Sequence, residues 1–124
     1  MSKGLRYDRD YLVGGPARAP VTPDFRLSEY ARPDGSVRVH RELVAAVQVV
    51  RNDLGQGVSI AGLDPRGALG RAVDGRFAWL KAASPTGLAA SAARAVRDGW
   101  LAKAEPRGDV LYVEKGRYAG RVVV

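Results

Sequence analysis

The chain has 124 residues, which fits one domain, and 46% of them are hydrophobic, which is enough to bury a core. It contains no cysteine, which excludes a disulfide framework and any cysteine-ligated zinc or iron–sulfur site. The formal charge of +7 permits binding to nucleic acid, anionic lipid or an acidic protein surface, and no apolar run is long enough to span a membrane.

The N-terminal segment, residues 1–24, shows neither helical nor strand periodicity, and glycine and proline interrupt it. This composition predicts an extended basic arm that docks on a neighbouring molecule, followed by a folded domain at residues 25–124. A disordered tail is the alternative reading of the same composition. The residues expected to bind the partner are the basic side chains and the spaced apolar anchors of the arm: Lys3, Arg6, Tyr7, Arg9, Tyr11, Leu12, Val13 and Arg18.

A long amphipathic helix is predicted from about His40 to Leu54, after a short helical turn with Ser28 as N-cap and a short strand at 36–39. Its apolar side chains recur at the spacing of one helix face: Leu43, Val44, Val47, Val50 and Leu54. Its polar side chains fall largely on the opposite face: Arg41, Glu42, Arg51 and Asn52. Gly55 and Gly57 follow the helix, where glycine can cap the last turn.

The second half of the chain alternates strand and helix patterns. The predicted elements are a strand at 58–61, a helix opening at Asp64-Pro65, a strand at 77–81, a helix from Ser84-Pro85 to about Val96, a hairpin of 100–104 with 109–114 across Glu105 to Gly108, and a last edge strand at 121–124. Together these elements predict an α+β fold. We expect an antiparallel sheet of about four or five strands packed against the 40–54 and 85–96 helices.

Four short motifs follow one another between residues 25 and 63: F-x-L-S-E-Y from Phe25, H-x-E-L-V from His40, V-R-N-x-L-G from Val50 and V-x-I-x-G from Val58. In this order they resemble the D-Ala-D-Ala carboxypeptidase family, small zinc peptidases of bacteria and their phages with the hedgehog/DD-peptidase fold. The resemblance extends weakly over residues 77–121. It implies a zinc ion held by two histidines and an aspartate beside an acidic general base, and a setting of phage particles or bacterial cell walls.

The chain departs from that family at the positions that carry the chemistry. Trp79 lies where the resemblance places the carboxylate ligand, and Tyr112 lies where it places the later histidine. The segment 73–76, which corresponds to the first histidine, contains none, and Asp64 replaces an arginine that helps to hold the substrate's carboxylate. Only Glu114 matches an acidic position of the family. The resemblance therefore implies a peptidase-like domain without its zinc ligands.

His40 is the only histidine of the chain, so a two-histidine zinc site cannot form, and serine catalysis lacks a G-x-S-x-G elbow. We therefore expect a protein that is not an enzyme and needs no cofactor. The favoured hypothesis is a structural protein of a bacteriophage particle, either a capsid decoration or a tail or neck component. Its expected location is the virion, and its expected partners are other virion proteins and further copies of itself.

Two alternatives stay open. The first is a cell-wall peptidase or a peptidoglycan-binding module. The second is a nucleic-acid-binding module, because the 85–98 helix and the hairpin after it resemble a recognition helix and its wing. That helix offers only Arg94 and Arg97 to phosphate, whereas a DNA-reading helix presents several polar side chains to the bases. Neither nucleic acid nor a membrane is an expected partner.

Overall fold

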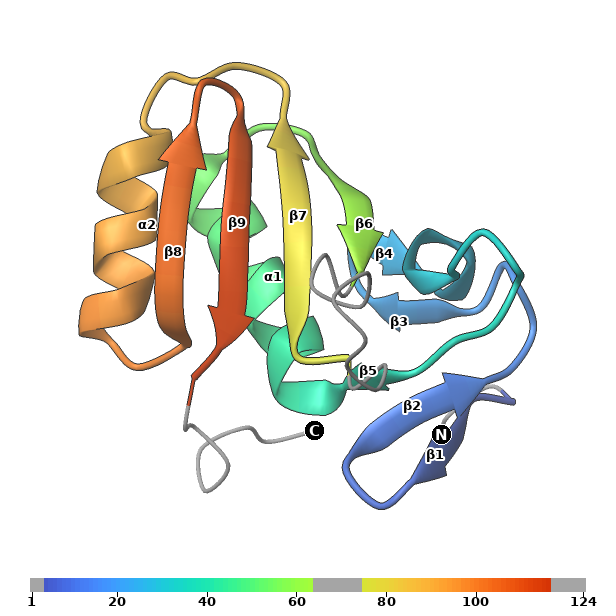
Figure 1. Ribbon diagram of the computed structural model, residues 1–124. Helices are drawn as coiled ribbons and strands as arrows, with labels where there is room; N and C mark the ends of the chain where they lie inside the picture. Colours follow the sequence, from blue (N-terminus) through green and yellow to red (C-terminus); the bar gives the residue numbers. More distant parts are fainter. Residues whose placement is uncertain (1–3, 64–74, 117–124) are drawn as a thin grey trace.

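The computed structural model describes residues 4–63 and 75–116 (Figure 1). Its elements are β1 (Arg6–Asp8), β2 (Tyr11–Gly14), β3 (Pro20–Thr22), β4 (Phe25–Arg26), the 3₁₀ helix η1 (Leu27–Tyr30), β5 (Val39–His40), α1 (Arg41–Leu54), β6 (Val58–Leu63), β7 (Phe77–Ala82), α2 (Leu88–Arg97), β8 (Leu101–Arg107) and β9 (Val110–Lys115). The predicted α+β class is confirmed. The described strands form three antiparallel sheets of three, two and four strands, rather than the single sheet that we expected. Most of the helix predicted from Asp64 and the whole strand predicted at 121–124 lie outside the described residues.

The largest sheet has the strand order β6-β7-β9-β8. Figure 1 shows α1 behind its middle strands and α2 along β8. Because side chains alternate across a strand, Ala78, Leu80 and Ala82 of β7 face the core and are buried, whereas Phe77 and Trp79 face the other side. The predicted hairpin of β8 and β9 is present, but its two-residue loop is Gly108-Asp109.

Pro106 belongs to β8 rather than to the loop of the hairpin. A proline is tolerated there because β8 is an edge strand, where a missing backbone N–H removes no bond from the ladder. Gly108 adopts φ +63°, a left-handed conformation that glycine enters without steric cost. The two-residue loop at Gly108-Asp109 therefore lies toward the C-terminal end of the turn that we predicted at 105–108.

α1 follows the predicted boundaries and buries the predicted face. Leu43, Val47 and Val50 are each at most 1% exposed, and Gly55 ends the helix at φ +65° with its N–H bonded to the Arg51 carbonyl. One assignment to the polar face is wrong: Glu42 is only 2% exposed. Its carboxylate is buried because Lys115 of β9 approaches it, as described below.

The N-terminal residues do not form an extended arm, and this expectation is corrected. β1 and β2 form a hairpin, and β2 pairs with β5 immediately before α1. Leu12 is completely buried in the same hydrophobic cluster as α1 and the large sheet, and Ala19 accepts a backbone bond from Leu27. Leu12, an apolar anchor that we expected to meet a neighbouring molecule, is therefore part of this chain's own core.

The turn after β4 also begins earlier than predicted. Arg26, not Ser28, is the N-cap of η1, and its backbone N–H donates to Glu29 Oε2 at 2.8 Å. Leu27 and Tyr30 of this turn are buried. Phe25 and Tyr30 pack with their ring centroids 6.2 Å apart, so η1 closes one end of the core.

The loop of the β1–β2 hairpin contains the only positive-φ residue other than glycine in the described chain, Arg9 at φ +56°. A left-handed conformation is costly for a residue with a Cβ, so Arg9→Gly is expected to raise the free energy of unfolding by about 0.5–1 kcal/mol. Arg18→Gly is the control, because Arg18 is also exposed but has an ordinary φ. Denaturant titration of the three proteins checks this; equal loss of stability in both variants would show that Arg9 is unstrained.

Candidate interaction surface

The residues predicted to bind a partner divide into an outer and an inner set. Arg6, Tyr7, Arg9 and Arg18 are exposed to solvent. Tyr11 and Val13 are half-buried, Leu12 is fully buried, and Lys3 lies outside the described residues. Only the outer set can meet another molecule without unfolding the hairpin. We define these four residues, three from the hairpin and Arg18 from the segment after β2, as the outer surface of the N-terminal hairpin.

Tyr11 fixes this hairpin to the rest of the protein. Its hydroxyl accepts a hydrogen bond from Arg76 Nε at 3.0 Å, and the Arg38 guanidinium carbon lies 3.9 Å from its ring centroid, close enough for a cation–π contact. The His40 ring meets the Tyr11 ring edge-on at 5.0 Å. These contacts hold the outer surface in a defined orientation.

The hairpin loop is also attached to the start of α1. The Arg41 backbone N–H donates to the Asp10 carbonyl at 2.8 Å, and the Arg41 guanidinium lies 3.4 Å from an Asp10 carboxylate oxygen. The first N–H groups of a helix have no partner inside the helix, so the loop satisfies one of them. The hairpin thus positions its exposed residues at the N-terminal end of α1.

A buried ion pair lies beneath this attachment. Lys115 Nζ donates to Glu42 Oε1 at 2.7 Å, and the two side chains are 17% and 3% exposed. Glu42 lies in the first turn of α1, where the positive end of the helix dipole favours a carboxylate. Sequence reasoning missed this pair because its members are 73 positions apart.

His40 caps α1. Its Nδ1 accepts the Glu42 backbone N–H at 3.1 Å, which requires the ring to be unprotonated at that nitrogen. Burial, together with the charge of Lys115, lowers the pKa of His40 below its ordinary range, although the carboxylates of Glu42 and Asp10 oppose the shift. The structure therefore favours the neutral imidazole.

This lowered pKa predicts a loss of stability in mild acid. In the unfolded chain His40 takes up a proton near its ordinary pKa of 6.5. In the folded chain its lowered pKa means that it takes up the proton only at a lower pH. Stability is therefore complete above about pH 6.5 and falls as the pH drops toward the folded pKa. Denaturant titration between pH 7.5 and pH 5 measures the slope, and His40→Asn, which keeps a capping oxygen but does not titrate, should flatten it. An unchanged slope in that variant would contradict the assignment.

Three positions that the family resemblance assigns to catalysis, Trp79, Tyr112 and Glu114, lie together on one face of the large sheet. This face points away from Ala78 and Leu80, and Tyr112 is only 5% exposed there. Trp79 of β7 is opposite Tyr112 of β9, and their ring centroids are 5.3 Å apart. The Tyr112 hydroxyl donates to Glu114 Oε2 at 2.9 Å. The arrangement is an aromatic pair with a hydrogen-bonded carboxylate, and indole and phenol groups do not supply the imidazole and carboxylate ligands that a zinc peptidase uses. Among the described residues, no group of three or more histidine, cysteine or acidic side chains could hold a metal ion.

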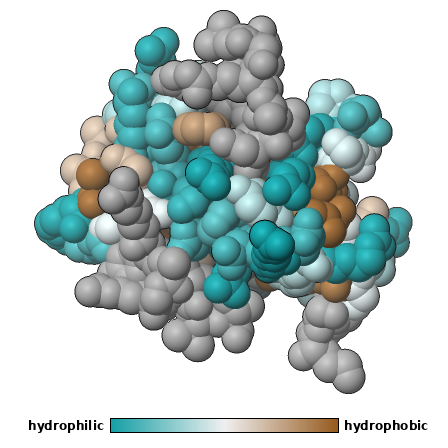
Figure 2. Space-filling model, turned by 60° about the horizontal axis from the view of Figure 1, so that its bottom comes forward, coloured by the Kyte–Doolittle hydropathy of each residue, from teal (hydrophilic) through white to brown (hydrophobic). Residues whose placement is uncertain are grey.

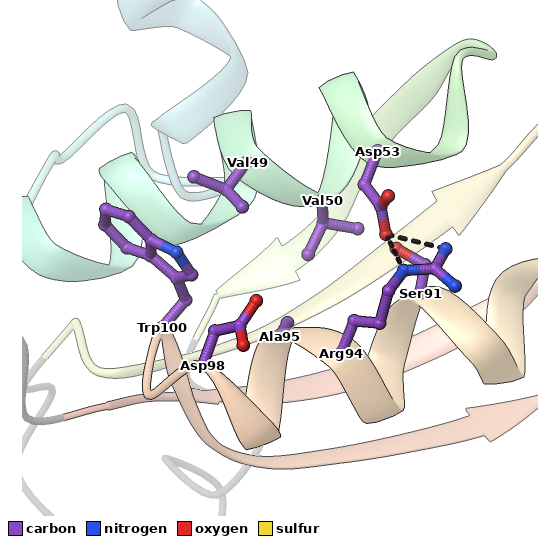
Figure 3. A pocket seen from close by; sticks show the side chains of 8 residues that line it. All are labelled: Val49, Val50, Asp53, Ser91, Arg94, Ala95, Asp98 and Trp100. Carbon is purple, nitrogen blue, oxygen red and sulfur yellow. Dashed lines mark hydrogen bonds and ion pairs between the residues drawn. The ribbon is translucent and has the colours of Figure 1, made fainter.

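A small hollow of about 140 Å³ lies between α1 and α2 (Figure 3). Asp53 of α1 faces Arg94 of α2, whose Nε lies 2.9 Å from Asp53 Oδ2, and this contact holds the pKa of Asp53 below its usual range. Val50, Ala95 and Trp100 are among the other residues that line the hollow. The pair is partly exposed, so it ties the two helices together by a contact of modest strength.

No family model, curated protein or solved structure matches this chain. The assignment of a function therefore rests on the residues described above. In the described part of the chain, neither α1 nor α2 has the length and apolar character of a membrane-crossing helix.

One face of the molecule carries a hollow beside the hairpin. Figure 2, in which the bottom of Figure 1 comes forward, shows a mostly hydrophilic face with small, separate hydrophobic areas. A hollow of about 540 Å³ lies between the hairpin and η1, lined by Arg6, Val13, Leu27, Ser28 and Val37 among others. Apolar residues scattered singly over a polar surface are normal for a folded protein, so the hollow and the exposed arginines, rather than the hydropathy, distinguish this face.

Proposed function

We propose that the protein is a non-enzymatic structural component of a bacteriophage particle, attached to its neighbours through the outer surface of the N-terminal hairpin. The observation that carries the proposal is the division of this hairpin into a buried anchor and an exposed basic surface. Leu12 is 0% exposed while Tyr7, at 42%, is one of the most exposed large apolar side chains in the described chain. A surface held this firmly suits a fixed position in an assembly, because little conformational entropy is lost on binding.

Charge supports an acidic protein partner. Arg6, Arg9 and Arg18 are exposed, and no ion pair with another described residue occupies any of them. Arginine is enriched at protein interfaces because its planar guanidinium forms bidentate bonds with carboxylates. Tyr7 adds an apolar body with a polar end beside these charges.

The cluster of Trp79, Tyr112 and Glu114 supports a role without catalysis. Glu114 is the one acidic residue that matches the family's general base, and it accepts the hydroxyl of Tyr112. Trp79 packs against that same tyrosine rather than presenting a ligand atom. The phage setting itself comes from the family resemblance of residues 25–63.

Purified phage particles from the source that encodes the chain provide the test. We expect the protein in gradient-purified particles at a fixed copy number, and we expect Arg9→Glu/Arg18→Glu to lower its occupancy. Arg107→Glu is a matched control, because Arg107 is an exposed arginine at the far end of β8. Absence of the chain from the particles would overturn the proposal. Chelator-sensitive cleavage of muropeptides by the purified protein would instead establish the peptidase alternative.

A further inference from the structure

β1 is an open edge of the small sheet. The strand order is β1-β2-β5, so among residues 4–63 and 75–116 β1 has a neighbour on one side only, and Arg6, Tyr7 and Asp8 are all exposed. An exposed edge strand presents unpaired backbone groups to another strand, unless charge, proline or a covering segment prevents the contact. β1 contains no proline, but a β-bulge interrupts its register with β2 between Arg6 and Tyr7, so Tyr7 and Asp8 form the regular part of this edge. Its charges, as shown below, permit pairing with one kind of partner.

The hairpin geometry decides which backbone groups face the open edge. Asp8 and Tyr11 flank the two-residue loop, and the pair that closes such a loop exchanges both of its hydrogen bonds. The next pair, Tyr7 with Leu12, is therefore of the non-hydrogen-bonded type, and the N–H and C=O of Tyr7 point away from β2. No backbone bond outside the strand ladders involves Tyr7 among the described residues.

The sequence of β1, Arg-Tyr-Asp, is complementary to itself in the antiparallel direction. A two-fold axis at Tyr7 places Arg6 of each strand opposite Asp8 of the other, and the two tyrosines opposite each other. Opposite charges across a strand pair are favourable, and like charges are unfavourable. Within the described chain, neither Arg6 nor Asp8 forms a hydrogen bond or ion pair of its own through its side chain. Asp8 is therefore available to a partner strand, whereas the Arg6 guanidinium lies against Gly14 of β2 and has to turn outward to reach one.

We propose that β1 pairs with β1 of a second copy of this chain, in an antiparallel ladder centred on Tyr7. The Tyr7 backbone groups of the two copies exchange two hydrogen bonds, and two Arg6–Asp8 pairs fix the register. Arg9 leaves the extended conformation, so the ladder ends there. The inference is independent of the proposed function, because it concerns the purified protein and holds whether or not the chain enters a particle.

Sedimentation velocity of the purified full chain is the test. Three residues from each copy make a small contact, so we expect a weak dimer with a dissociation constant on the order of 0.1 mM. The sedimentation coefficient should then rise as the concentration increases from about 10 µM to about 1 mM. A protein that remains monomeric over this range would overturn the proposal and leave the edge for a different partner.

Charge exchange tests the register. Arg6→Asp and Asp8→Arg each create two like-charge pairs in a self-dimer, and each should weaken dimerisation by about tenfold. An equimolar mixture of the two variants restores both opposite-charge pairs and should associate as the wild type does. A mixture no tighter than the separate variants would contradict the register, whereas variants that had merely unfolded could not recover on mixing.

Tyr7→Pro tests the backbone contact. Proline removes the N–H that faces the open edge and leaves the β1–β2 bonds in place, so this variant should remain folded and monomeric. Arg18→Asp is the control for charge, because Arg18 is also an exposed arginine near the N-terminus but lies outside β1. This variant should dimerise as the wild type does. Wild-type dimerisation of Tyr7→Pro would overturn the proposed ladder.

Discussion

Replacing Lys115 with methionine is expected to lower the free energy of unfolding by about 3–5 kcal/mol at neutral pH, because it leaves the buried Glu42 carboxylate without its partner. The Glu42 side chain is 3% exposed, and the Lys115 ammonium lies 2.7 Å from one of its carboxylate oxygens. The other carboxylate oxygen, Oε2, is buried and forms no hydrogen bond to a described residue. A charge in this position cannot turn to water without opening the start of α1.

Two further variants separate the loss of a pair from the burial of a charge. Glu42→Gln/Lys115→Met removes both charges and should recover most of the stability that Lys115→Met loses. Lys81→Met breaks a pair of the same length, 2.7 Å to Asp109, whose side chains are 55% and 39% exposed. It should cost less than about 1 kcal/mol. Denaturant titration compares the three proteins, and equal losses for Lys115→Met and Lys81→Met would show that burial of Glu42 has no energetic consequence.

Leu12→Ala is expected to lower the free energy of unfolding by about 2–5 kcal/mol, the usual range for emptying a buried leucine site. Leu12 belongs to the N-terminal hairpin, yet it is 0% exposed and lies in the main hydrophobic cluster. For the same reason, deletion of residues 1–24 should unfold the domain rather than release a separate arm.

Val96→Ala is the matched control for Leu12→Ala. Val96 is 40% exposed on α2, and its truncation should change stability by less than about 0.5 kcal/mol. Thermal and denaturant unfolding measure both variants. Similarly small losses of stability in the two variants would contradict the burial of Leu12 and would indicate that the hairpin is not part of the core.

Sequence periodicity predicted the elements whose burial is decided within the element. The face of α1 that carries Leu43, Val47 and Val50 follows from helix spacing alone, and the alternating burial of β7 agrees with the strand predicted at 77–81. Gly55 ends α1 as a left-handed glycine, a local requirement that the sequence displays directly.

The misassigned residues depend on partners far away in the chain. β1 and β2 have three and four residues, too few for a period, and β2 is placed by its pairing with His40 and Val39. Glu42 is a polar residue at a buried position because of Lys115. Neither the pairing of β2 with β5 nor the contact of Glu42 with Lys115 can be identified from a window of neighbouring residues. The burial of Leu12 could therefore not be predicted from the sequence pattern.

The separation of 73 positions between Glu42 and Lys115 also has a kinetic consequence. The β1–β2 and β8–β9 hairpins close over two-residue loops and can form within microseconds, whereas a contact between distant segments waits for the chain between them to be ordered. We therefore expect the Glu42–Lys115 contact to form after the folding transition state. Its loss should speed unfolding and leave the folding rate nearly unchanged, so this ion pair governs how long a folded copy persists rather than how quickly it is made.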